Sequence, residues 1–234
     1  RKNVVSRAKE LGYTPASRTA SKATFDLTVN NPKVGGVTPS SLTINRGHEF
    51  TTVFDGTSYT FIALDNKTIT PSTGQFKFEE LDVYQGKLST DIYRYDGQVS
   101  NQRFPMLNTN IDTSTITVNI DSNSTVTAWT RAGDLTGITS SSNVWYLQEN
   151  DEGLFELYFG DGIIGAEPKD GDEITISYLV TDNNHANGAS VFSMATSVNG
   201  NSNVSFTNTV SASGGKDIET TDQIKFSASK FYTS

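Results

Sequence analysis

The sequence predicts a mainly β fold, built as antiparallel β-sandwich or meander sub-domains with a short helix at each end. Three observations predict it. Apolar and polar residues alternate over many short segments, Ser, Thr and Asn make up about a third of the 234 residues, and only 19% of the residues are charged. Thr favours strands, whereas Ser, Asn and Gly favour turns, so this mixture indicates many short strands joined by tight turns.

The first element is a helix within residues 1–13. Its apolar residues recur at helical spacing: Val4, Val5, Ala8 and Leu11. Gly12 stands where a helix C-cap is expected. A basic amphipathic stretch can bind a membrane or a nucleic acid, but at this length we favour a helix that packs on a neighbouring part of the protein.

From residue 23 the hydrophobic period changes from helical to two. Phe25, Leu27 and Val29 alternate with polar residues, which predicts a half-buried strand. The same pattern predicts further strands at residues 41–45, 49–54, 58–64, 75–84 and 88–95. Asp55-Gly56 marks a hairpin turn. Strands at this spacing are typical of a sandwich or barrel.

A polar connection at residues 101–110 precedes the second group of strands. Alternation predicts strands at residues 115–120, 125–131, 143–149, 154–159, 173–181 and 203–210, while residues 191–198 stay ambiguous. Thr220-Thr221-Asp222 then offers capping residues for a C-terminal helix.

These patterns predict four regions. They are an entry helix and linker (1–22), a first β sub-domain (23–110), a second β sub-domain (111–212) and the truncated start of a C-terminal helical region (213–234). One extended domain fits the sequence equally well. The chain begins at Arg1 without a methionine and stops without a helix stop signal, which suggests a fragment.

Composition excludes several classes of function. The chain has no Cys and two His, which removes thiolate chemistry and leaves little room for His-based catalysis. Its net charge of −8 disfavours nucleic-acid and anionic-membrane partners. We therefore predict that the protein is not an enzyme and uses no cofactor and no metal.

Three alternatives were weighed against that prediction. Acidic clusters such as Glu79-Glu80 could serve a glycosidase, but neighbouring strand residues point to opposite faces and form no dyad. Asp161-Gly162 and Asp170-Gly171-Asp172 could hold calcium, although tight turns explain them equally and the EF-hand pattern is absent. Trp129, Trp145 and Tyr146 could bind sugar, or pack in the core. A carbohydrate-binding or calcium-stabilised β module of a surface or tail-tip protein is thus the second hypothesis.

The segment from residue 154 to residue 178 carries the most specific pattern. Its turns predict a compact β corner, because glycine permits positive φ and Pro168 fixes the approach to a turn. The pattern residues are Phe159, Gly160, Asp161, Gly162, Gly165, Pro168, Gly171, Ile174 and Tyr178.

This pattern resembles the signature of the J-like baseplate proteins of contractile-tailed phages and related injection machines. Two further segments are similar to that family. One is the helix-to-strand entry with Leu11-Gly12-Tyr13 and Pro15, and the other pairs Ala186-Asn187-Gly188 with Gly214-Gly215. Together the three segments cover nearly the whole chain. Within the family, the Ser/Thr/Asn-rich character is most similar to the baseplate wedge proteins of T-even-type phages.

The resemblance implies a structural role rather than a catalytic one. It implies a subunit that forms a homodimer and a higher ring in the assembled baseplate, links wedges around the hub, and docks other baseplate wedge proteins. It also implies a place in the virion tail baseplate, assembled in the host cytoplasm, and a rearrangement when the sheath contracts. The family has no catalytic residues to carry over, and residues 75–142 match no motif of it.

Overall fold

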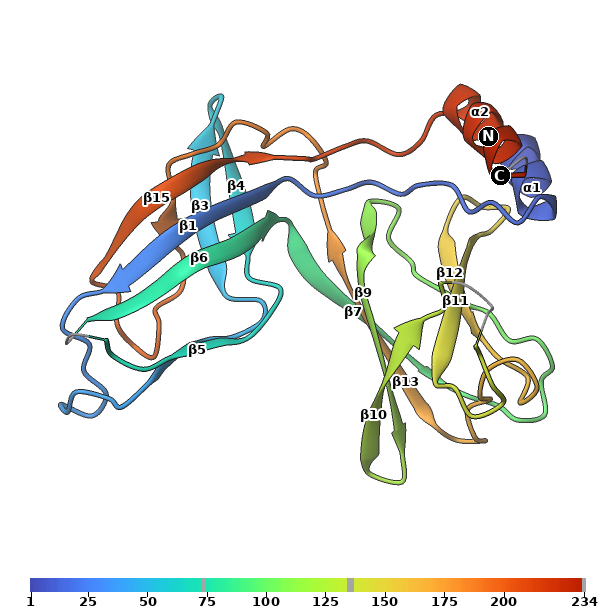
Figure 1. Ribbon diagram of the computed structural model, residues 1–234, viewed down its shortest axis with the longest axis horizontal. Coiled ribbons are helices and arrows are strands. Elements are labelled where there is room, and N and C mark those ends of the chain that lie inside the picture. The colour runs from blue at the N-terminus through green and yellow to red at the C-terminus, as the bar shows by residue number, and fades with distance from the viewer. Residues whose placement is uncertain (73–74, 134–136, 233–234) are drawn as a thin grey trace. The chain divides into compact units, whose positions relative to one another are not determined.

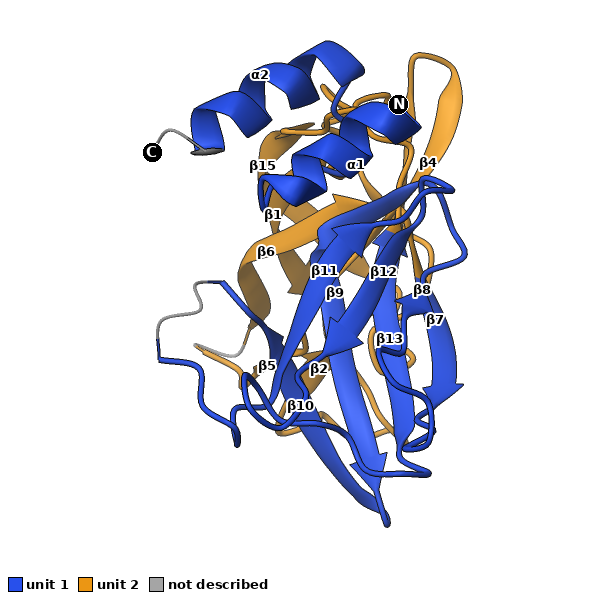
Figure 2. Ribbon diagram, turned by 90° about the vertical axis from the view of Figure 1, so that its right-hand side faces the viewer, with its two compact units in different colours: residues 1–17, 89–179, 218–234 blue, residues 18–88, 180–217 orange. Residues whose placement is uncertain are grey.

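The computed structural model describes residues 1–72, 75–133 and 137–232. The last two residues of the predicted C-terminal helical region, 233–234, lie outside the described residues. The chain forms two compact units (Figure 2). Unit 1 comprises residues 1–17, 89–179 and 218–234, and unit 2 comprises residues 18–88 and 180–217. The predicted mainly β fold with a short helix at each end is confirmed (Figure 1).

Both units are assembled from segments that are far apart in the sequence. The predicted boundaries at 22/23, 110/111 and 212/213 each fall inside one of the compact units. Compactness alone does not define a folding domain, so the predicted four-region division stays a prediction about folding units.

Unit 1 holds both helices and a seven-stranded sheet with the order β7-β13-β9-β10-β11-β12-β8. Its elements are α1 (Lys2–Glu10), β7 (Lys87–Arg94), β8 (Phe104–Pro105), β9 (Ile111–Ser122), β10 (Thr125–Arg131), β11 (Val144–Glu149), β12 (Phe155–Phe159), β13 (Glu173–Val180) and α2 (Thr221–Tyr232). Neither of the described helices has the length and apolar character that crossing a bilayer requires.

One strand pair in this sheet departs from the predicted antiparallel arrangement. Strands β10 and β11 run parallel, with Thr130 opposite Val144. Parallel neighbours need a connection of about a dozen residues or more, and residues 132–143 supply it. The pairs β9–β10, β11–β12 and β12–β8 are antiparallel.

The two helices end and begin at the residues that their capping signals indicate. At the end of α1, Tyr13 N donates to Ala8 O and Gly12 N donates to Lys9 O, both at 2.9 Å, and Gly12 has φ +76°. This is a Schellman motif, which needs glycine at the left-handed position. Before α2, Thr220 and Gln223 bond reciprocally as a capping box, with Thr220 N to Gln223 Oε1 at 2.8 Å.

Unit 2 holds a six-stranded sheet with the order β14-β3-β4-β6-β1-β15 and a two-stranded ribbon, β2-β5. Its elements are β1 (Lys22–Val29), β2 (Leu42–Ile44), β3 (Glu49–Phe54), β4 (Thr57–Ile62), β5 (Lys67–Ile69), β6 (Phe76–Gln85), β14 (Ser193–Met194) and β15 (Val204–Ser213). Phe25 is fully buried in the core of this unit. The centroid of its ring lies 5.0–5.2 Å from those of Phe50 on β3, Phe192 just before β14 and Phe206 on β15, so aromatic contacts join β1 to these parts of the unit.

A buried carboxylate fixes an irregular point in this sheet. Asp26 on β1 is 5% exposed and accepts hydrogen bonds from Lys77 Nζ at 2.8 Å, Glu80 N at 2.8 Å and Asn208 Nδ2 at 2.6 Å. Glu80 and Asn208 have positive φ, and the strand registers shift beside them. The bonds from Lys77, then from Glu80 and Asn208, lower the pKa of Asp26 to about 2. Asp26 therefore holds β6 and β15 to β1 where the ladder is interrupted.

Candidate functional site

The sequence pattern at residues 159–178 folds into a corner between β12 and β13. Asp161 accepts hydrogen bonds at Oδ1 from Ile163 N at 3.0 Å and Ile164 N at 3.1 Å, and Gly162 N donates to Gly165 O at 3.1 Å. The two bonds from backbone N–H groups, Ile164 first, lower the pKa of Asp161. The side chain of Asp161 thus closes the turn in place of a backbone carbonyl.

Gly160 is required for a different reason. A Cβ at this position would overlap the carbonyl oxygens of Ile164 and Gly165, because the chain folds back on itself there. Gly165 has φ +87°, a conformation that favours glycine. Thus glycine is needed at one end of the turn for space and at the other for backbone conformation.

The rest of the pattern anchors the corner to the sheet. Gly171 N donates to Tyr95 O at 2.9 Å, and Pro168 is buried. Ile174 and Tyr178 are fully buried on β13. The hydroxyl of Tyr178 donates to Asp91 Oδ2 on β7 at 2.7 Å. The ring of Phe159 on β12 lies with its centroid 5.1 Å from that of Trp129 and 5.5 Å from that of Phe104. The pattern residues therefore have structural tasks in unit 1, and their role as the family motif stays a prediction.

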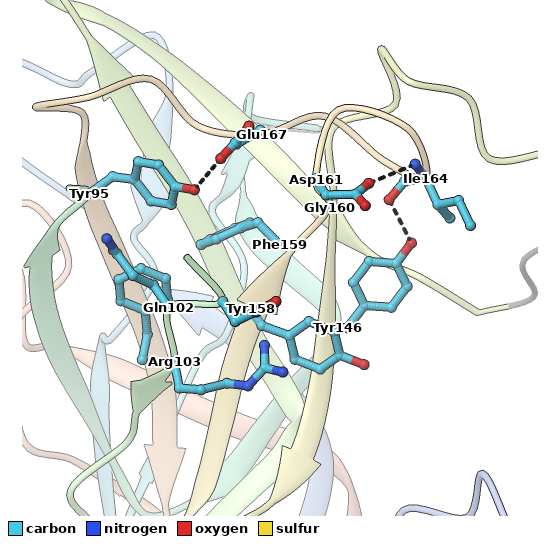
Figure 3. A pocket seen from close by; sticks show the side chains of 12 residues that line it. Tyr95, Gln102, Arg103, Tyr146, Tyr158, Phe159, Gly160, Asp161, Ile164 and Glu167 are labelled. Atoms are coloured by element: carbon cyan, nitrogen blue, oxygen red, sulfur yellow. Dashed lines mark hydrogen bonds between the residues drawn. The ribbon is translucent and has the colours of Figure 1, made fainter. Parts of the chain in front are cut away.

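A pocket of about 280 Å³ lies beside this corner (Figure 3). The rings of Tyr146 and Tyr158 stack with centroids 5.0 Å apart, and the guanidinium of Arg103 lies 4.1 Å from the Tyr158 centroid. Across the pocket, the Tyr95 hydroxyl donates to Glu167 Oε1 at 2.7 Å. Burial, and then this bond, raise the pKa of Tyr95 to about 12.

Two of these groups do not match the roles of a general base or of a glycosidase acid. Tyr95 keeps its proton at neutral pH and cannot act as a base. Asp161 has a lowered pKa, whereas a glycosidase acid needs a raised one. Among the residues described, no three His, Cys, Asp or Glu side chains gather as a metal site requires.

The two tryptophans considered as sugar platforms are core residues. Trp129 is 8% exposed and Trp145 is 2% exposed, and Trp145 Nε1 donates to Trp129 O at 3.1 Å. Since a stacking platform must be exposed, neither tryptophan can serve as one. Their strand alternation was compatible with both locations, and the structure selects the core.

The other two segments of the family resemblance also have defined partners. Asn187 donates through Nδ2 to Gly215 O and accepts at Oδ1 from Gly215 N, both at 3.1 Å. A Cβ on Gly215 would overlap Asn183 O and Ser21 Oγ. The Ala186-Asn187-Gly188 loop and the Gly214-Gly215 exit therefore meet within unit 2, which their separation in sequence conceals.

The helices of unit 1 form a second candidate surface. Val5, Ala8, Ile224 and Ala228 are the buried residues of a small core between α1 and α2. A largely apolar groove of about 490 Å³ runs beside this core, with Arg7 and Lys225 among its lining residues. On α2, Phe226 is 71% exposed and Phe231 is 56% exposed. The sequence predicted both helices but not the exposure of these rings, because the pattern of one helix does not show which elements pack against it.

A salt bridge holds α1 to the sheet of unit 1, and a hydrogen bond joins the end of α1 to the segment before α2. Arg1 donates to both carboxylate oxygens of Glu149, at 2.9 and 2.8 Å, and Glu149 is 1% exposed. The Tyr13 hydroxyl donates to the carboxylate of Glu219, with distances of 3.0 and 2.9 Å to its two oxygens. Bidentate pairing fixes orientation as well as distance, so the groove is a defined surface of this unit.

Comparison with known proteins agrees with a structural protein of this kind. Residues 91–181 match the family described as bacteriophage baseplate wedge protein gp6, third domain. That match nearly coincides with the middle segment of unit 1, residues 89–179. The class of protein to which this part of the chain is similar is therefore that of bacteriophage baseplate wedge proteins.

The second comparison names a particular relative. The chain is 27% identical over 252 aligned residues to the baseplate wedge protein gp6 of Enterobacteria phage T4. The alignment covers 96% of this chain and 36% of that protein, so the chain spans about a third of the length of this relative. The chain is thus similar to a baseplate wedge protein over nearly its whole length, and this likeness agrees with the localisation expected from the sequence, the virion tail baseplate.

Proposed function

We propose that this chain is a structural part of a phage tail baseplate wedge and acts through protein–protein contacts without catalysis. It associates with a second copy of itself, joins other baseplate wedge proteins, and helps to link wedges into a ring around the hub. When the sheath contracts, these contacts persist while the subunits rearrange. The likeness to a baseplate wedge protein over 96% of the chain supports this proposal.

The observation that carries the proposal is the uncovered helix pair. Phe226 and Phe231 of α2 are large apolar side chains that are mostly exposed, and Ile224 and Ala228 of the same helix line a largely apolar groove. Exposed apolar surface of this kind marks a protein–protein contact. Because Arg7 and Lys225 are the charged residues that line the groove, it fits an apolar segment flanked by acidic residues, contributed by another wedge protein.

Two measurements test this function. Antibody labelling of intact virions, read by electron microscopy, should place the chain at the baseplate. Phe226→Ser should reduce recovery of the protein with the other wedge proteins. Val126→Ser is the matched control, since Val126 lies on β10 and is 65% exposed. Absence of label from baseplates, or equal recovery of the two variants, would contradict the proposal.

A further inference from the structure

One long segment of unit 2 carries no charge. Residues 183–215 contain no Lys, Arg, Asp or Glu, in a chain of which 19% of the residues are charged. This segment includes β15, which lies at the margin of the six-stranded sheet next to β1 (Figure 1). Edge strands usually carry charged residues or proline, which discourage pairing with other chains. The edge formed by β15 has neither within residues 204–213.

The hydrogen-bond pattern shows which backbone groups of this edge face outward. Asn30 N donates to Asn203 O at 2.8 Å, and the register continues as Val29 opposite Val204 and Leu27 opposite Phe206. In an antiparallel ladder, residues alternate between pairs that exchange hydrogen bonds and pairs that do not. The N–H and C=O groups of Val204 and Phe206 therefore point away from β1.

Only the first part of β15 offers a regular free edge. Asn208 has a φ of +52°, and the register with β1 shifts between Thr207 and Val210. Near the far end, Ala212 N donates to Ala189 O at 2.8 Å and Gly188 N donates to Ala212 O at 2.7 Å. Bulges and local loops thus protect the second half of the strand, and residues 204–207 are left as the regular unpaired stretch.

We infer that residues 204–206 pair antiparallel with the same residues of a second copy of this chain, about a two-fold axis at Ser205. This register sets Val204 opposite the partner subunit's Phe206. In such a pair each residue donates its N–H to the C=O of the other, so two hydrogen bonds form. Val204 and Phe206 are partly buried on the core side of the sheet, so the pairing also covers their exposed portions.

The lack of charge selects a second copy as the occupant. Near a two-fold axis the residue on the axis faces its own copy and its neighbours lie close to theirs, so a charged residue there would meet a like charge. An uncharged strand avoids that repulsion, and it offers nothing that would attract a charged segment of another protein. This inference rests on the proposed self-association and assigns it a surface.

The absence of cysteine makes a direct test possible. In the inferred register Ser205 faces its own copy as a pair without hydrogen bonds, with Cα atoms about 4.5 Å apart, which is within the range of about 4.4–6.8 Å that a disulfide spans. The purified Ser205→Cys protein, incubated with oxidised glutathione, should form a covalent dimer. Ser211→Cys is the control, since Ser211 is an exposed serine of the same strand that lies outside the regular stretch, where the register with β1 shifts.

A second pair of variants measures affinity. Ser205→Lys places like charges opposite each other and should raise the dissociation constant of the dimer by about fivefold, whereas Ser211→Lys should leave it unchanged. Circular dichroism confirms that each variant is folded.

A dimer that neither cysteine links, and that both lysine variants retain, would overturn the β15 pairing and leave the wedge function intact. A monomeric chain would overturn both the pairing and the self-association, while virion labelling would still report the location. Linkage of Ser205→Cys to a different wedge protein would make that protein the occupant instead.

Discussion

Two edge strands of this protein differ in the charge that they present to other chains. β7 borders the sheet of unit 1 and carries Lys87, Asp91 and Arg94 within eight residues. β15 borders the sheet of unit 2 and carries no charge within ten residues. Both expose unpaired backbone groups, so side-chain charge is what separates them. The charged side chains of β7 therefore oppose pairing with another chain, whereas the edge of β15 stays available for it.

The means of fixing each edge strand also differ. β7 is held through Asp91, which accepts a hydrogen bond from the buried Tyr178. β15 is held through Asn208, which donates to the buried Asp26. In each case a carboxylate joins an edge strand to its sheet. In unit 1 the carboxylate belongs to the edge strand, and in unit 2 it belongs to the neighbouring strand, which leaves the edge neutral.

The largest expected effect is a loss of stability in unit 1 that leaves association through unit 2 unchanged. Gly160→Ala should lower the free energy of unfolding by about 3 kcal/mol, because its Cβ overlaps backbone oxygens that cannot move without distorting the corner. Gly162→Ala in the same turn should cost about 1 kcal/mol, since only its φ of +78° opposes a side chain and no atom lies within 4 Å. Urea unfolding followed by fluorescence measures both. Equal losses would contradict the steric account of the corner. Association through β15, in unit 2, should persist in both variants.

A smaller effect tests the attachment of the charged edge. Tyr178→Phe removes the hydroxyl that donates to Asp91 and accepts from Asn108 Nδ2 at 3.1 Å. Because the buried tyrosine loses a hydrogen bond to a charged group, the free energy of unfolding should fall by about 2 kcal/mol. Tyr146→Phe serves as the control, because its hydroxyl makes only a 3.4 Å contact with Ile164 O. A neutral result for Tyr178→Phe would show that β7 does not depend on this bond.

Acid should weaken the attachment of the neutral edge. The pKa of Asp26 is about 2 in the folded protein, against 3.8 as its ordinary value. A lowered carboxyl pKa stabilises the fold fully above the ordinary value, and this stabilisation is lost as the pH falls through 3.8 toward 2. Thermal unfolding between pH 5 and pH 2 should therefore show a steeper loss in the native protein than in Asp26→Asn. Parallel curves would show that Asp26 does not supply this stability.

The smallest effect concerns the charges on β7 itself. Replacing Lys87 and Arg94 with Thr should make this edge more prone to self-pairing, because both residues are exposed. Cross-strand pairs contribute about 0.2–1 kcal/mol, so association should increase by about fivefold or less. Sedimentation velocity over a concentration series detects such a change. Unchanged sedimentation would indicate that charge is not what defends β7.

Local patterns predicted the local structure well. Period-two alternation located β1 and most longer strands, and Gly12 and Thr220 predicted the ends of the helices, because these signals depend on residues a few positions apart. The short strands β5 and β8 were not predicted, and residues 191–198, which contain β14, stayed ambiguous. A strand of two or three residues is too short to show alternation and forms only because a partner lies beside it.

Long-range structure lay beyond the sequence patterns. The interleaving of the two units, the parallel pairing of Thr130 with Val144, and the meeting of Asn187 with Gly215 depend on contacts between distant segments. Each is set by tertiary packing, which no local period reports. The glycine pattern predicted a compact corner, but the pocket beside it also needs Arg103 and Tyr95 from outside the pattern.

The central claim is that the neutral edge of β15 joins two copies of this chain within the baseplate. The most direct test is Ser205→Cys introduced into the phage, followed by mild oxidation of intact virions and electrophoresis of their purified baseplates without reductant. The account predicts a disulfide-linked dimer from Ser205→Cys and none from Ser211→Cys. Baseplates that contain the Ser205→Cys protein solely as an unlinked monomer would contradict it.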